Sequence, residues 1–103
     1  MRVVFTDQAL EDLDGIHEYG LAEWGAARSG EFMVRLGESI YGLADSPYRG
    51  RSREAFHPGL RSILHRQYVV FYMIEGNDVV IGAVIHERRN HAALDFADRL
   101  EDG

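Results

Sequence analysis

The stretch from Pro58 to Asn90 reads PGLRSILHRQYVVFYMIEGNDVVIGAVIHERRN. It contains three runs rich in β-branched and aromatic residues, a composition typical of strands. The connections between the runs are at most four residues long, which favours antiparallel hairpins. The stretch therefore predicts a three-stranded antiparallel meander with strands at Leu60–Leu64, Tyr68–Ile74 and Val79–His86.

Two helices are predicted ahead of this meander. Apolar residues recur at three- and four-residue spacing up to Trp24-Gly25, and again up to the stop at Ser46-Pro47. Thr6 is a candidate N-cap, and the abrupt join at Gly25 favours an antiparallel helix hairpin on one face of the sheet. The predicted core between hairpin and sheet is Leu13, Ile16, Trp24, Phe32, Leu36, Ile40, Val70 and Tyr72.

The remaining segments complete an α+β fold. Arg2–Phe5 predicts a short N-terminal strand, whose place in the sheet the pattern leaves open. Tyr48–Gly59 is rich in Gly, Arg and Ser and predicts an irregular surface loop. His91–Leu100 predicts a weak C-terminal helix or tail, with Asn90 as its possible cap. We expect residues 1–103 to form a single domain, since the length suits one modest core.

Composition excludes several classes of protein. The chain is 46% hydrophobic and 27% charged, as folded domains are, and the absence of Cys excludes disulfides and thiolate metal sites. No stretch approaches the ~20 apolar residues of a membrane helix, and the start of the chain has no signal-peptide pattern. We expect a cytoplasmic protein. The His spacing predicts no metal site, and no pattern indicates a cofactor.

Charge is segregated along the chain. Residues 1–46 carry 3 Arg and 9 acidic residues, residues 47–91 carry 7 Arg and 4 acidic residues, and residues 92–103 carry 1 Arg and 4 acidic residues. The net charges are therefore −6, +3 and −3, and every cation is Arg. Such an acidic chain is not expected to bind nucleic acid sequence-specifically. The basic residues of the middle segment are Arg49, Arg51, Arg53, Arg61, Arg66, Arg88 and Arg89.

Short motifs in a fixed order carry a family resemblance. They are Ala9 with Asp12-Leu13 and Ile16, Trp24-Gly25 with Ala27, Leu43 with Pro47 and Gly50-Arg51, Pro58-Gly59-Leu60-Arg61-Ser62, Val70-Phe71-Tyr72, and His86-x-Arg88. With these motifs the chain resembles ParE-type toxins of the RelE/ParE superfamily, from bacterial type II toxin–antitoxin modules. The resemblance covers residues 5 to 90 and implies the RelE/ParE-like fold.

The resemblance implies a toxin that inhibits DNA gyrase and is neutralised when a cognate antitoxin binds it. The RelE branch instead cleaves mRNA on the ribosome, with an Arg in the central strand and a Tyr near the end of the last strand. Here Val69 and Glu87 stand at those two positions, which favours the gyrase inhibitor. Two alternatives stay open: a ribosome-dependent endoribonuclease using His86, Glu54 and Arg61, or a degenerate module that binds the antitoxin without poisoning anything.

Two groups of site residues follow. A patch for the target or partner is predicted at the strand ends, comprising Arg61, His86, Arg88 and Arg89. An antitoxin groove is predicted at Trp24, Tyr68 and Tyr72, each of which has a simpler interpretation as a core residue. For Arg61, an ion pair with an acidic residue on the neighbouring strand is as simple an interpretation as a partner contact. The antitoxin is expected to add a helix to a groove or a strand to an open sheet edge.

Overall fold

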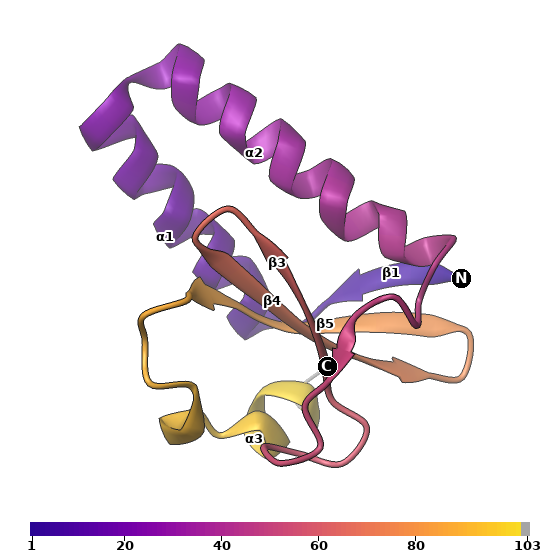
Figure 1. Ribbon diagram of the computed structural model, residues 1–103. Helices are drawn as coiled ribbons and strands as arrows, with labels where there is room; N and C mark the ends of the chain where they lie inside the picture. Colours follow the sequence, from indigo (N-terminus) through magenta and orange to yellow (C-terminus); the bar gives the residue numbers. More distant parts are fainter. Residues whose placement is uncertain (102–103) are drawn as a thin grey trace.

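Five strands form one sheet in the order β1-β5-β4-β3-β2. The structure is a computed structural model that describes residues 1–101; residues 102 and 103, which the predicted domain includes, lie outside the described residues. Figure 1 shows the elements, which in chain order are β1 (Arg2–Phe5), α1 (Asp7–Trp24), α2 (Ala26–Tyr41), η1 (Gly42–Ala44), β2 (Arg51–Ser52), β3 (Arg61–His65), β4 (Tyr68–Glu75), β5 (Asp78–His86), η2 (His91–Ala93) and α3 (Phe96–Glu101).

The predicted antiparallel meander is confirmed as β3, β4 and β5. At one edge, β1 runs parallel to β5, and at the other edge β2 pairs with the first two residues of β3. The expectation of a wholly irregular Tyr48–Gly59 loop is therefore wrong at Arg51–Ser52. Two residues are too few to show a period-two pattern, and the pairing of β2 is set by contact with β3.

The α1–α2 hairpin covers one face of the sheet (Figure 1). Thr6 caps α1 as predicted, since its Oγ1 accepts a hydrogen bond from the Ala9 amide at 3.1 Å. Gly25 joins the helices with φ of 85°, a left-handed conformation that glycine adopts without steric cost. The buried residues of this face are Ala9, Ile16, Leu36, Ile40, Leu43, Tyr68, Val70, Tyr72, Val79, Ile81 and Val84, with Leu13 and Phe32 packed against them.

Trp24 is not part of this core, so its predicted role as core anchor is wrong. The side chain is half-buried at the tip of the hairpin, where its ring lies edge-on to Phe32 and Tyr19 at centroid distances of 5.7 and 6.1 Å. The helical periodicity placed Trp24 on the correct stripe of α1. The helix, however, extends past the end of the sheet, so this last turn of α1 covers no strand (Figure 1).

The opposite face of the sheet has a second apolar layer that the sequence did not predict. Its buried residues are Leu60, Val69, Phe71, Val80, Ala83, Ile85, Phe96 and Leu100, with Phe56 packed against them. The expected weak helix over His91–Leu100 is instead a 3₁₀ turn, capped by Asn90 as predicted, followed by the short α3. Phe96 and Leu100 are 3% and 6% exposed, so this segment packs firmly on the sheet.

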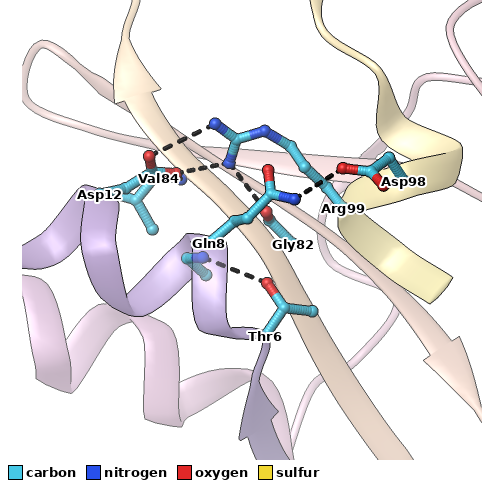
Figure 2. Close-up of polar contacts among 8 residues, drawn as sticks. Thr6, Gln8, Asp12, Gly82, Val84, Asp98 and Arg99 are labelled. Atoms are coloured by element: carbon cyan, nitrogen blue, oxygen red, sulfur yellow. Dashed lines mark hydrogen bonds and ion pairs between the residues drawn. The ribbon is translucent and has the colours of Figure 1, made fainter. Parts of the chain in front are cut away.

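A polar cluster beside β5 joins the two layers (Figure 2). Beyond the end of β1, Asp12 of α1 accepts a hydrogen bond from the Val84 amide at 3.0 Å. Arg99 of α3 lies 2.7 Å from the Asp12 carboxylate and donates to the Gly82 carbonyl at 3.1 Å. Gly82 is the extra residue where the β4–β5 register shifts. At this edge of β5, the Asp12 and Arg99 side chains make the backbone hydrogen bonds that a neighbouring strand would otherwise make.

Candidate functional site

The predicted site residues fall at two opposite ends of the sheet. We call the end where β3 stops, β4 begins and β5 stops the distal end; there His65 lies opposite Tyr68, and Tyr68 lies opposite His86. Arg61 begins β3 and lies opposite Tyr72. Arg61 and His65 are four positions apart along β3, which is roughly 13 Å along the sheet. The predicted patch that joins Arg61 to Arg88 and Arg89 is therefore wrong.

Arg61 holds the loop that precedes β2. Its Nη1 donates to the carbonyls of Gly50 at 2.8 Å and Tyr48 at 3.2 Å, and the guanidinium lies 5.0 Å from the centroid of the Tyr48 ring. The described ion pairs do not include Arg61, so it does not have the acidic partner that was the simpler expectation. Its contacts order the connection from the hairpin to the sheet.

Glu54 also lies far from His86. Its carboxylate accepts a hydrogen bond from the Gly59 amide at 2.9 Å, within the loop that leads into β3. This loop is tied to the start of β3 because the Arg53 amide donates to the Leu60 carbonyl at 2.7 Å. The three residues considered for RNA cleavage are thus not gathered around one point.

At the distal end, His86 is held by the turn that follows β5. Its Nδ1 accepts a hydrogen bond from the Arg88 amide at 3.1 Å, so in the neutral ring the proton is on Nε2. The ring lies edge-on to Tyr68 at 5.7 Å. Arg88 and Arg89 extend from this turn with exposed side chains. The structure therefore brings together three of the four predicted partner-binding residues.

Of the predicted groove residues, Tyr72 is enclosed and cannot line a groove. It is fully buried, its hydroxyl donates to the Pro47 carbonyl at 2.7 Å, and it accepts from the Gly50 amide at 3.0 Å. Burial raises the pKa of this phenol. Tyr68 is 6% exposed and packs against Phe32, and burial raises its pKa as well.

Trp24 lines a cavity of about 370 Å³ between the hairpin tip and the β3–β4 turn. We call it the tip cavity; its lining residues are Trp24, Arg28, Glu31, Phe32, Arg35, His65, Arg66 and Gln67. Burial, together with the nearby Arg66 charge, lowers the pKa of His65. The sequence pointed to Trp24 and Arg66 but not to Arg28 and Arg35. The signal available for these two was their seven-residue spacing, which places them on the same side of α2.

Two negative findings apply to residues 1–101. No group of three or more His, Asp or Glu side chains in this part of the chain is placed to hold a metal ion. Within the same residues, no helix has the length and apolar character needed to cross a membrane.

The comparison with protein families decides the relationship. The family described as "ParE toxin of type II toxin-antitoxin system, parDE" matches residues 3–91. The chain belongs to the ParE toxin family. The match to the ParE pattern ends at His91, so α3 and Arg99 lie beyond it.

Individual relatives agree with this membership. The ParE chain is 33% identical over 102 residues to a "Toxin ParE" of Escherichia coli, covering 96% of this chain and 92% of that protein. It is 30% identical over 92 residues to "Toxin ParE3" of Caulobacter vibrioides, covering 89% and 92%. A solved structure titled "Chromosomal ParDE TA system from P. aeruginosa" superposes with a TM-score of 0.74 at 22% identity, over 84% of this chain and 95% of the other, and confirms the α+β fold.

Proposed function

We propose that this ParE-family toxin arrests growth by inhibiting DNA gyrase through protein contact, without catalysis of its own, and that a cognate antitoxin neutralises it by direct binding. One observation carries the choice against RNA cleavage: Glu54 and Arg61 lie at the opposite end of the sheet from His86. General acid–base catalysis needs its groups within hydrogen-bond reach of one reacting phosphate. Family membership supports the toxin role itself.

The surface proposed for the target is the turn after β5, where His86, Arg88 and Arg89 gather. Arg is enriched at interface hot spots because its planar fork binds carboxylates and stacks on aromatic rings. Both Arg side chains are exposed, so a partner reaches them without any rearrangement of the fold. Contact made through these charges needs no proton transfer by His86.

The second candidate is a ribosome-dependent endoribonuclease. It is favoured by the same turn, because His86 carries its neutral-form proton on Nε2 and two guanidiniums lie beside it in sequence. In this alternative, His86 exchanges a proton with the RNA while Arg88 and Arg89 bind phosphate. The turn then does chemistry as well as binding.

Purified toxin variants distinguish these functions. We expect His86→Gln to retain gyrase inhibition in a DNA supercoiling assay, and Arg88→Ala with Arg89→Ala to lose most of it. Ribosome-bound mRNA is mapped for cuts in parallel. If His86→Gln abolishes growth arrest with antitoxin binding intact, and the wild type cuts mRNA, the nuclease replaces the proposal. A wild type with neither activity that still binds the antitoxin is a degenerate module.

A further inference from the structure

The tip cavity is a concave site at the distal end of the sheet. It opens between Trp24 and Phe32 of the hairpin and the turn Arg66-Gln67 that joins β3 to β4. The Gln67 carbonyl accepts a hydrogen bond from the Glu87 amide at 2.8 Å, so the cavity wall is continuous with the turn after β5. The cavity therefore borders the turn after β5, although none of its lining residues belongs to that turn.

Positive charge is concentrated in the cavity. Arg28, Arg35 and Arg66 line it, and Glu31 is the one carboxylate among the lining residues. Glu31 is paired with Arg35 at 3.5 Å, whereas the ion pairs of the described residues include neither Arg28 nor Arg66. Since the whole chain carries a net charge of −6, this local excess of cations favours an anionic ligand group.

The rest of the lining is aromatic. Trp24 and Phe32 lie edge-on at 5.7 Å, and the His65 ring lies edge-on to Phe32 at the same distance. The Nε2 atom of His65 is buried and has no hydrogen-bond partner among the described residues. Buried polar atoms in folded proteins are generally paired, so this nitrogen leaves an unsatisfied polar group in the wall of the cavity. The lining thus suits a ligand with both an apolar body and a polar end.

Arg66 holds an unfavourable backbone conformation. Its φ is 56°, and it is the one residue other than glycine with positive φ in the described chain. Glycine or asparagine adopts this conformation at less steric cost. Arg66 and Gln67 form the two-residue loop between β3 and β4, and such a loop requires a positive φ at its first residue, where glycine is common. An arginine at this position accepts backbone strain for the sake of its side chain, as residues at functional sites do. The guanidinium of Arg66 is therefore the expected point of contact.

We propose that the tip cavity binds an acidic segment of the antitoxin, with a carboxylate between Arg28 and Arg66 and an apolar side chain against Trp24 and Phe32. The choice of the antitoxin as partner rests on the proposed function. A nucleic acid is a poorer occupant, because the cavity of about 370 Å³ is bounded by Glu31 and by a segment, residues 1–46, of net charge −6. Such a site accepts single carboxylates and repels a continuous polyanion.

The decisive variant is Arg66→Gly, because it removes the guanidinium and also relieves the backbone strain. Its melting temperature is expected to equal or exceed that of the wild type. Calorimetric titration with the purified antitoxin is expected to give an affinity about thirtyfold weaker for Arg66→Gly, the lower bound for truncating one partner of a desolvated charge pair. Arg28→Ala is expected to weaken binding of the antitoxin by a similar factor. Arg2→Ala, which removes an equal charge at the other end of β5, is the control.

Trp24 supplies an independent readout because it is the sole Trp of the chain. With a Trp-free antitoxin, binding is expected to shift its fluorescence and to protect it from acrylamide quenching. Unchanged quenching at saturation, or equal affinities for Arg66→Gly and wild type, overturns the proposal. Self-association of the toxin through Trp24, detected by its mass in solution without antitoxin, also overturns it.

Gyrase assays separate this inference from the proposed function. Arg66→Gly without antitoxin is expected to inhibit gyrase as the wild type does. If neither protein inhibits gyrase but the affinities differ as described, the proposed target fails and the cavity assignment stands. If both proteins inhibit gyrase and the antitoxin binds them equally, the cavity assignment alone fails.

Discussion

The two faces of the sheet are buried by different means. On one face, α1 and α2, with 18 and 16 residues, cover the strands through amphipathic stripes that are evident in the sequence. On the other face, the six-residue α3 and a loop bring together Phe96, Phe56 and Phe71, with Phe71 and Phe96 centroids 4.9 Å apart. The first layer comes from local periodicity. The second depends on contacts between residues distant in the sequence, and it is tied to the first by the Arg99–Asp12 ion pair.

The largest effect is expected on the hairpin face. Leu36→Ala should lower the free energy of unfolding by about 4 kcal/mol, because Leu36 is fully buried and the long helices restrict collapse around the cavity. Leu100→Ala should cost only about 2 kcal/mol, since the six-residue α3 can shift to fill the space that the smaller side chain leaves. Urea denaturation measures both, with Val34→Ala, 62% exposed, as the control. Equal costs would contradict the difference between the faces.

The connection between the faces is tested by Arg99→Ala. This change leaves the Asp12 carboxylate, with a side chain 13% exposed, without its cation, and it removes the donor to the Gly82 carbonyl. We expect a loss of about 3 kcal/mol in unfolding free energy. A double-mutant cycle with Asp12→Asn, measured by urea denaturation, gives the coupling energy. Additive losses would mean that the two layers are independent.

Tyr72→Phe sharpens the description of the hairpin face. The change removes the hydroxyl that joins the Pro47 carbonyl and the Gly50 amide, leaving two backbone groups without their partner. We expect a loss of about 1–2 kcal/mol by thermal or urea unfolding. Tyr19→Phe, at a residue that is 55% exposed, is the matched control and should be neutral. If Tyr72→Phe has the same unfolding free energy as the wild type, water has replaced the hydroxyl as the partner of these two backbone groups.

The smallest effect concerns pH. Burial lowers the pKa of His65 below its ordinary value of 6.5, so below that pH the unfolded chain binds more protons than the folded one. The contribution of His65 to stability is therefore complete above pH 6.5 and declines as the pH falls below it. His65→Gln should reduce the slope of melting temperature against pH in this window. An identical slope in both proteins would contradict the assignment.

The hairpin face could be predicted because its signals are local. Runs rich in β-branched and aromatic residues gave the meander, and three- and four-residue spacing gave both helices. The residue type of Thr6, just ahead of the first helix, gave the cap. The second face could not, because α3 contributes just Phe96 and Leu100, a single four-residue spacing with no stripe. The two-residue β2 likewise has no pattern of its own. Elements that exist through tertiary contact carry little sequence signal.

The candidate site was predicted in part. His86 and Arg88 at the end of β5 follow from the strand boundaries, but Arg61 was placed with them wrongly. The predicted topology already implied this separation. β3 and β5 both pair antiparallel with β4, so they run in the same direction, and the start of β3 and the end of β5 are at different ends of the sheet. The tip cavity needed the structure, since its walls come from the end of α1, from α2 and from the turn between β3 and β4, which lies far along the chain.

The ion pair between Asp12 and Arg99 also implies an order of folding during synthesis. Its partners are separated by 87 positions, so the hairpin and the meander are both synthesised before Arg99. Until Phe96 and Leu100 have emerged, the second face of the sheet lacks the helix that covers Val69 and Phe71. A nascent chain therefore closes the hairpin face first and the second face later.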